Sequence, residues 1–222
     1  ESIDASHLAE LQRAYLVSNW DQIDAFGDTD QLAALTGERK HEALIADLRS
    51  LDTKIDELLG SGSIQEIAGS YNDAELLFVL GKGFNFPVAQ DAARKVSEVS
   101  YKSAHAFHPS EMKHGPLALV TEDTPVIGIL AGEDLNDDNG ICTDLKEVQI
   151  RGAPLILIAG ENQEIPLGLG KSDALIRVPE ARTELASILV TTAIQLFIYY
   201  LADSLDRTID KPRNLAKSVK LE

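Results

Sequence analysis

Cysteine is nearly missing from this chain of 222 residues, because Cys142 is the single one. An internal disulfide needs two cysteines and a cysteine-based zinc site needs several, so both are excluded. Such low cysteine usage is typical of the reducing cytosol, which predicts a cytoplasmic location. Two interpretations of Cys142 remain, a half-buried apolar side chain or a reactive thiol, and the first is the usual role of a lone cysteine.

Positive charge is also scarce. The chain has 20 Lys and Arg against 36 Asp and Glu, which gives a net charge of −16 and a pI near 4.6. A polyanion would be repelled by this field, so sequence-independent nucleic-acid binding is excluded. A small phosphorylated ligand is still allowed, because local hydrogen-bond donors can overcome a distant net charge.

Long apolar runs are absent from the sequence. The longest apolar stretch, residues 193–202, is interrupted by Gln195, whereas a membrane span needs about 18 residues. We therefore expect no membrane segment, and no signal-peptide pattern opens the chain. The chain begins at Glu1, which indicates a processed chain or a piece of a longer one. With 44% apolar and 25% charged residues, it is long enough for one large α/β domain or two small ones.

Residues 1–60 have the pattern of helices. Apolar side chains recur there at three- and four-residue steps: Leu8, Leu11, Tyr15 and Leu16, then Leu44, Ile45, Leu48, Leu51, Ile55 and Leu58. The segment Gly60-Ser-Gly-Ser63 then breaks the pattern. It is either a simple connection between helices or a phosphate cradle at the start of the next helix.

From residue 74 onward, strands and helices alternate. Short apolar runs at residues 76–80, 125–131, 154–159 and 174–178 are typical of strands buried on both faces of a sheet. Amphipathic helices are predicted between and after them: residues 86–101 and 180–205. The fold class is therefore α/β, with a parallel sheet of about five strands between layers of helices. Ligands of such sheets bind beyond the carboxyl ends of the strands.

A row of charged side chains lies on the first of these helices. Asp91, Lys95 and Glu98 stand at i, i+4 and i+7, which puts all three on one helix face. An exposed face with an Asp–Lys pair explains the spacing by itself. The functional interpretation is a carboxylate, Glu98, whose protonation alternates beside the cation Lys95.

Two further segments carry groups that can do chemistry. His114 lies in a short polar segment closed by Gly-Pro, and it is either a surface histidine or a proton carrier. His105 and His108 lie near it, but their spacing matches no familiar zinc signature, so we predict no metal site. Lys217 in the tail is either a solvated lysine near a terminus or a desolvated amine that attacks carbonyls.

Three segments together resemble one family. The sequence Phe78-Val-Leu-Gly-Lys-Gly-Phe-Asn-Phe-Pro-Val-Ala-Gln-Asp-Ala-Ala-Arg-Lys-Val-Ser-Glu-Val-Ser-Tyr101 looks like the strand, loop and helix of a sugar-isomerase (SIS) domain. Ser110-Glu-Met-Lys-His-Gly-Pro-Leu-Ala-Leu119 and Pro212-Arg-Asn-Leu-Ala-Lys-Ser-Val219 are similar to segments of the glucosamine-6-phosphate synthases, also called glutamine–fructose-6-phosphate aminotransferases (isomerising). The resemblance covers roughly residues 45–222 and implies the C-terminal SIS domain of that family.

This resemblance implies roles for four residues in converting fructose 6-phosphate and ammonia into glucosamine 6-phosphate. Glu98 would move the proton between C1 and C2, and Lys95 would stabilise the developing charge. His114 would assist ring opening, and in the family it comes from the neighbouring subunit. Lys217 would form the Schiff base with the open-chain ketose. The chemistry agrees, because imine formation acidifies the adjacent C–H and a carboxylate can take that proton.

The phosphate loops depart from the family pattern. In the family, Ser- and Thr-rich loops of the first SIS domain hold the phosphate, whereas residues 81–85 and 130–134 of this chain carry no hydroxyl side chain. Glu133 and Asp134 would repel a phosphate. We still expect Gly81 and Gly83 to contact the sugar, together with Ala216 of the tail.

The expected organisation follows from these features. We assign residues 1–60 to a helical N-terminal segment, 61–210 to the SIS domain and 211–222 to a C-terminal catalytic tail. The first segment is either the end of a preceding SIS domain or a dimerisation arm. Since Glu1 stands where the family's glutaminase has its nucleophilic cysteine, we expect no glutamine hydrolysis by this chain.

The sequence therefore predicts the isomerase half of a glucosamine-6-phosphate synthase-type enzyme. It would use a sugar-phosphate substrate and need no cofactor. Its partners would be a second SIS domain or a second copy of the chain in a homodimer. Two alternatives stay open: a stand-alone sugar-phosphate isomerase or deaminase, and a non-catalytic SIS module that senses an amino-sugar phosphate.

Overall fold

The computed structural model describes residues 38–133, 135 and 140–215. The chain divides into two compact units, Glu1–Ser50 and Leu51–Glu222. In the first unit, the described part is helix α4 (Glu38–Arg49). The helical pattern expected at residues 8–16 lies outside the described residues.

A five-stranded sheet forms the centre of the second unit. Its strands are β1 (Leu76–Leu80), β2 (Ser103–Phe107), β3 (Val126–Ile129), β4 (Leu155–Gly160) and β5 (Ala174–Val178). The spatial order is β2-β1-β3-β4-β5, and every neighbouring pair is parallel. The predicted α/β class with about five parallel strands is confirmed.

The apolar runs form the inner strands because both faces of the sheet are covered. Every residue of β3 and β4 is buried. Side chains alternate between the two faces along a strand, so Phe78 and Leu80 point to one face while Leu77 and Val79 point to the other. Phe78 and Leu80 join Leu145 of helix α8 (Ile141–Ile150) in one apolar cluster.

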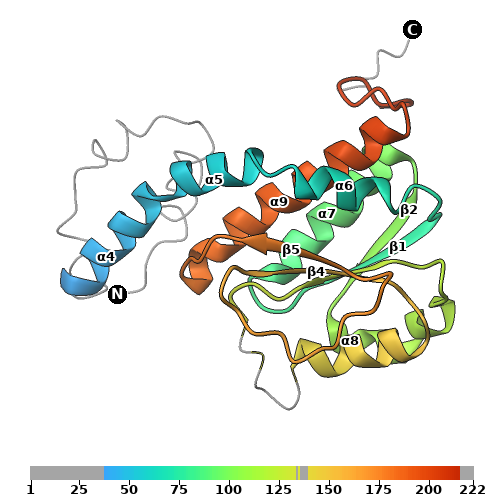
Figure 1. Ribbon diagram of the computed structural model, residues 1–222, viewed down its shortest axis with the longest axis horizontal. Coiled ribbons are helices and arrows are strands. Elements are labelled where there is room, and N and C mark those ends of the chain that lie inside the picture. The colour runs from blue at the N-terminus through green and yellow to red at the C-terminus, as the bar shows by residue number, and fades with distance from the viewer. Residues whose placement is uncertain (1–37, 134, 136–139, 216–222) are drawn as a thin grey trace, which may run out of the picture. The chain divides into compact units, whose positions relative to one another are not determined.

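Helices cover the two faces of the sheet unequally, as Figure 1 shows. One face carries α7 (Asn85–Ser100) and α9 (Thr183–Ser204), which pack on each other, with α6 (Ser63–Gly69) and α5 (Leu51–Leu59) against α9. The other face carries α8, with the short 3₁₀ helix η1 (Pro109–His114) beside it. The result is a three-layer domain.

Helix α9 is the central helix of its layer. Among the described residues it is the one helix whose length and composition would allow it to cross a membrane. Ten of its side chains are nevertheless buried in the domain, from Leu185 to Ala202. Burial by α6 and α7 explains this apolar character without a membrane.

Strand β2 and helix α8 are not among the elements that the sequence predicted. β2 has the sequence Ser103-Ala-His-Ala-Phe107 and lies at the edge of the sheet with alternate exposed residues, so it lacks a continuous apolar run. The apolar pattern expected across residues 44–58 is divided between α4 and α5, because Ser50 interrupts the helix. A second 3₁₀ turn, η2 (Pro116–Leu119), follows η1.

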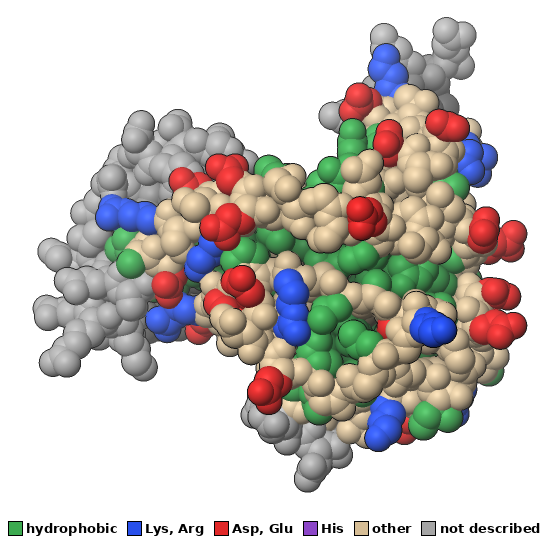
Figure 2. All heavy atoms as spheres, in the orientation of Figure 1, with side chains coloured by type: hydrophobic (Ala, Val, Ile, Leu, Met, Phe, Trp, Pro, Cys, Tyr) green, Lys and Arg blue, Asp and Glu red, His purple; other side chains and the backbone are tan. Residues whose placement is uncertain are grey.

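The surface agrees with the acidic composition. Figure 2 shows acidic side chains spread over one face with lysines and arginines among them, and no continuous basic patch on that face.

Candidate functional site

A groove of about 1030 Å³ lies along the second half of α7 and edge strand β2. The last described residues of the tail, Arg213 to Leu215, also line it. Among its described lining residues, Glu98 is the only carboxylate. The cations are Arg94, Lys102 and Arg213. The groove is thus locally positive in a chain of net charge −16, which favours a small anionic ligand.

Glu98 reaches this groove because α7 is amphipathic. Ala92, Ala93 and Val96 are buried in the domain, while Glu98 is exposed on another face of the helix. The carboxylate is therefore accessible to a ligand in the groove.

Lys95 lies one turn before Glu98, but it contacts a different carboxylate. Its ammonium forms an ion pair with Asp91 at 3.3 Å, which is the i,i+4 pair that the spacing predicted. Both side chains are more than a third exposed, so the pair contributes little to stability. Lys95 does not line the groove.

The tail is held next to Glu98 by Tyr101. The backbone N–H of Arg213 donates a hydrogen bond to the Tyr101 hydroxyl at 2.9 Å. The Arg213 guanidinium lies 4.2 Å from the centre of the Tyr101 ring, and the guanidinium of Arg207 lies 5.1 Å from it. No local pattern predicted these contacts, although Tyr101 and Arg213 belong to the two quoted family segments.

Lys102 closes one end of the groove. Its ammonium donates hydrogen bonds to the carbonyls of Asn72 and Ala74 at 2.6 and 2.7 Å. Partial burial lowers the pKa of Lys102 below its ordinary value, and the nearby Arg207 lowers it further. Lys102 therefore joins β2 to the loop before β1, and its donors are engaged.

Gly81 and Gly83 lie at the opposite end of α7. A Cβ at Gly81 would overlap the backbone carbonyl of Asn85, and Gly83 has a φ of +54°. The loop therefore needs glycine at both positions to turn from β1 into α7. A rise of about 1.5 Å per residue puts Glu98 about 20 Å from Asn85 along the helix. The structure does not bring these glycines together with Glu98.

Hydrogen bonds connect the loops at the carboxyl edge of the sheet. Asn85 is buried and donates to the carbonyl of Ala131 and to a carboxylate oxygen of Glu133, both at 3.0 Å. Gln163 donates to the carbonyls of Leu130 and Glu133, also at 3.0 Å. Asp134, the other expected acidic residue, lies outside the described residues.

The partial burial of Glu133 changes the pKa of its carboxyl group. Burial raises the pKa of the Glu133 carboxyl above its ordinary value, while the hydrogen bond from Asn85 and the charges of Lys82 and His108 lower it in part. A phosphate beside Glu133 would make ionisation of this carboxyl group still more costly, because like charges would then lie together. The lack of a phosphate cradle in this region stays a prediction.

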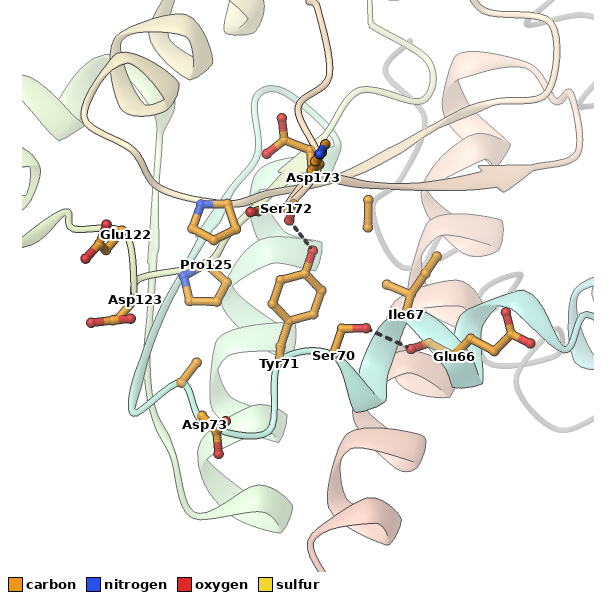
Figure 3. Close-up of a pocket in the computed structure, with 14 residues that line it drawn as sticks. Glu66, Ile67, Ser70, Tyr71, Asp73, Glu122, Asp123, Pro125, Ser172 and Asp173 are labelled. Carbon is orange, nitrogen blue, oxygen red and sulfur yellow. Dashed lines mark hydrogen bonds between the residues drawn. The ribbon is translucent and has the colours of Figure 1, made fainter.

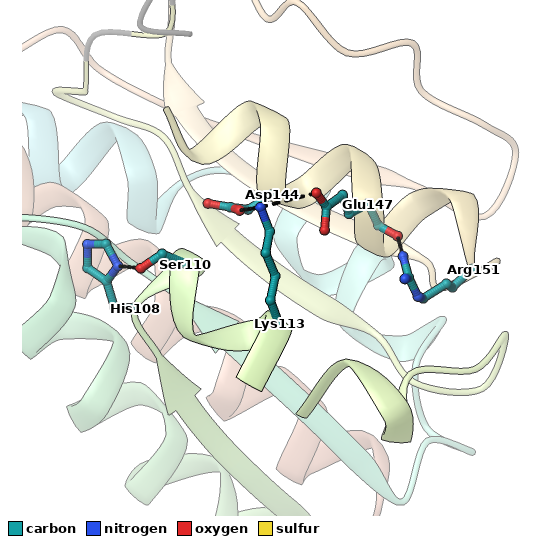
Figure 4. A network of polar contacts seen from close by, with 6 residues as sticks. All are labelled: His108, Ser110, Lys113, Asp144, Glu147 and Arg151. Carbon is teal, nitrogen blue, oxygen red and sulfur yellow. Dashed lines mark hydrogen bonds and ion pairs between the residues drawn. The ribbon is translucent and has the colours of Figure 1, made fainter. Parts of the chain in front are cut away.

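His114 ends η1 and is exposed. Two neighbours hold this segment: Met112 is buried, and the ammonium of Lys113 forms ion pairs with Asp144 at 3.2 Å and Glu147 at 3.1 Å on α8 (Figure 4). The hydrogen bonds that the Lys113 ammonium donates to Glu147 and Asp144 raise the pKa of Lys113. The segment is thus fixed to α8, and the exposed His114 is not among the residues that line the groove.

The other two histidines of this region lie near β2. His105 contacts Ser103 at 3.2 Å, and His108 contacts Ser110 at 2.7 Å. Within residues 38–133, 135 and 140–215, no group of three or more His, Cys, Asp or Glu side chains could hold a metal ion. Lys217 and Ala216 lie beyond Leu215, outside the described residues.

A second cavity, of about 570 Å³, opens at the amino ends of the strands (Figure 3). Its lining is mainly acidic: Glu66, Asp73, Glu122, Asp123 and Asp173. Tyr71 donates a hydrogen bond to the carbonyl of Ser172 at 3.0 Å, and burial with the charge of Asp173 raises its pKa to about 12. None of the site residues predicted from the sequence lines this cavity.

Comparison with known proteins identifies the family of this architecture. The family model of the SIS domain matches residues 70–203. A glutamine–fructose-6-phosphate aminotransferase (isomerizing) of Pseudomonas putida is 38% identical over 180 residues, and one of Pseudomonas syringae pv. tomato is 39% identical over 180 residues. Both alignments cover 81% of this chain, and the chain spans 29% of the length of these curated relatives.

A solved structure supports the same relationship. The C-terminal domain of glucosamine-fructose-6-phosphate aminotransferase from Francisella tularensis superposes with a TM-score of 0.72 at 26% identity. The superposition covers 78% of this chain and 48% of that one. These matches confirm the resemblance that the three sequence segments indicated.

Proposed function

Since this chain belongs to the SIS domain family, we propose that it is the isomerase half of an enzyme of the glucosamine-6-phosphate synthase type. The observation that carries this proposal is the shared groove of Glu98 and the tail. A proton-transfer carboxylate and an imine-forming amine must act on adjacent carbons of one sugar. Lys217 follows Leu215 by two residues, a reach of about 7 Å, so its amine can approach Glu98.

The proposed reaction begins at Lys217. Its amine adds to the C2 carbonyl of open-chain fructose 6-phosphate, and water leaves as the imine forms. Ammonia then displaces the lysine amine at C2. Glu98 removes a proton from C1, the resulting enolamine accepts a proton at C2, and C1 becomes the aldehyde of glucosamine 6-phosphate. Lys95, one helical turn from Glu98, would stabilise the developing negative charge.

His114 would act in a neighbouring subunit. It is exposed on a segment that α8 holds in place, and it does not line the groove of its own chain. An exposed imidazole on a segment held by ion pairs suits ring opening at the site of a second copy. We therefore propose a homodimer, in the cytoplasm, as the working form.

The phosphate would be bound by another SIS domain. At the carboxyl edge of this sheet, Asn85 and Gln163 donate hydrogen bonds to Glu133, and the loops there carry no hydroxyl side chain for a phosphate. Gly81 and Gly83 stay predicted sugar contacts. They would contact a ligand at the carboxyl edge of the sheet, because they lie too far from Glu98 to contact a ligand beside it. Ala216 stays a predicted contact within the tail.

Trapping of the imine tests the proposal. Borohydride reduces an imine between fructose 6-phosphate and a lysine to a stable amine, so the assembled enzyme should gain the mass of one sugar phosphate. Lys217→Ala should abolish this gain, and Lys220→Ala, a change in the same tail, should leave it intact. Trapping that survives Lys217→Ala contradicts the imine role.

The same preparation separates the alternatives. Turnover by the purified chain alone would indicate a stand-alone isomerase or deaminase. Binding of an amino-sugar phosphate without turnover, in the presence of a second SIS domain, would indicate a sensor.

A further inference from the structure

Tyr101 has a backbone conformation that needs an explanation. It follows the last residue of α7 with a φ of +63°, in the left-handed region that side chains other than glycine seldom adopt. Such a conformation costs free energy and persists where the surroundings impose it. Here it turns the ring of Tyr101 away from α7 and toward the tail, three residues after Glu98.

Two arginines from either end of one loop meet on that ring. Arg207 comes just after α9, and Arg213 comes just before the end of the described tail. A guanidinium near an aromatic ring is attracted by the electrons of its face, at up to about 6 Å from the ring centre. The distances of 5.1 and 4.2 Å satisfy this condition, so both ends of the loop are held on one side chain.

A hydrogen bond fixes the register of the tail. The Tyr101 hydroxyl accepts the backbone N–H of Arg213 at 2.9 Å, which ties the main chain itself and not only a side chain. Asn214 follows with a φ of +62°, a second left-handed residue, and Leu215 then enters the groove with Glu98. The main chain of the described tail is thus tied to Tyr101 two residues before Leu215.

We propose that Tyr101 is a positioning residue, which anchors the loop 207–213 and with it the start of the tail that carries Lys217. This inference rests on the proposed function for its catalytic consequence. Tyr101 also lines the groove, but its contacts are with the loop, so its role is to hold the tail and not to react. Its contribution is to shorten the search of the tail amine for the sugar carbonyl, since a group held near its target reacts without a loss of freedom at the moment of reaction.

The test uses two substitutions of Tyr101. Tyr101→Phe keeps the ring and removes the hydroxyl, and Tyr101→Asn removes the ring while placing a residue that tolerates the left-handed conformation. In the assembled enzyme, we expect Tyr101→Asn to slow borohydride trapping and kcat at least tenfold while KM for fructose 6-phosphate changes less than threefold. Tyr101→Phe should fall between it and the unaltered enzyme.

Tyr199→Asn is the matched control, because it makes the same substitution at an exposed tyrosine of α9 that lies outside the groove. It should leave the trapping rate unchanged. A second arm measures amide hydrogen exchange of Arg213 in the chain without sugar. Protection of this N–H should fall in Tyr101→Phe and Tyr101→Asn, whereas amides of β3 and β4 keep theirs if the domain is folded.

The two arms distinguish failure of this inference from failure of the proposed function. If the unaltered enzyme forms no imine, the proposed function is wrong, and the exchange of Arg213 still reports whether Tyr101 anchors the tail. If the enzyme traps sugar and Tyr101→Asn traps it equally fast, the positioning role is overturned. Unchanged protection of Arg213 overturns the anchor itself.

Discussion

Glu98 is exposed on its helix, so its chemistry can be removed without disturbing the fold. We predict that Glu98→Gln lowers the rate of proton transfer in the assembled enzyme by about 10²–10⁴-fold, the usual contribution of a positioned acid or base. Exchange of the C1 proton of fructose 6-phosphate with deuterium oxide measures this step. The melting temperature should not change, because a surface substitution alters stability by less than about 0.5 kcal/mol.

Glu57→Gln, at an exposed position on α5, is the control for this substitution. It should leave both proton exchange and melting temperature as they are. Full exchange activity in Glu98→Gln would mean that another group moves the proton.

Glu133 predicts a pH dependence of stability. Burial raises its pKa in the folded chain, so the folded state holds its proton at a pH where the unfolded state has lost it. Stability from this group is therefore greatest at low pH and decreases as pH rises from the ordinary value of 4.5 through the raised one. Glu133→Gln, which can still accept the hydrogen bond from Asn85, should be free of this loss.

Urea unfolding at pH 4 and pH 7 measures the difference. We expect Glu133→Gln to gain stability relative to the unaltered chain as pH is raised. Glu57→Gln again serves as control and should show no such gain. An equal effect of Glu133→Gln at both pH values would contradict a raised pKa.

The segment η1–η2 depends on a glycine between its two turns. Gly115 has a φ of +142° and a ψ of −52°, which L side chains rarely adopt. Gly115→Ala should therefore lower the free energy of unfolding by about 1–3 kcal/mol, although space for a Cβ is available. Urea unfolding of Gly115→Ala and of the unaltered chain, fitted with one shared m-value, measures this change.

Gly69 is the control for Gly115, because its backbone lies in a helix and can accept a side chain without strain. It is exposed in α6, and a Cβ added there would meet nothing within 4 Å, so Gly69→Ala should be neutral or stabilise the chain by up to about 1 kcal/mol. Equal destabilisation by both substitutions would show that the backbone of Gly115 is not strained by a side chain.

From the arrangement of the whole domain, we predict that the isolated chain binds fructose 6-phosphate weakly. The groove brings Glu98 and three cationic side chains together, whereas at the carboxyl edge of the sheet Gln163 donates a hydrogen bond to the carbonyl of Glu133 and the Glu133 carboxyl group would disfavour a phosphate. Isothermal titration with fructose 6-phosphate should give a dissociation constant weaker than about 1 mM, or no heat. Addition of a second SIS domain, the partner proposed above, should restore binding.

Tight binding by the isolated chain would contradict this prediction and require another phosphate site. Ser61 and Ser63 are the next candidates in the sequence. In the structure their hydroxyls lie 2.8 Å apart and bond to each other at the start of α6. Substituting both by alanine would then show whether they hold the phosphate.

Much of the fold could be predicted because its signals are local. Strands β1 and β5 have the predicted bounds, and β3 and β4 lie within one or two residues of theirs, since buried parallel strands are continuous apolar runs. Edge strand β2 carries Ser103 and His105 on an exposed face, so it has no such run. The local spacing of Asp91 and Lys95 likewise predicted their ion pair.

The sequence by itself determined the α/β class, the family and the row of charged side chains on α7, because periodicity and motifs are properties of neighbouring residues. The tertiary structure alone decided where these groups lie. It separates Gly81 from Glu98 by the length of a helix, and it joins Tyr101 to Arg213 across more than a hundred residues of chain. Contacts between such distant residues follow from how the layers pack, which no local pattern records.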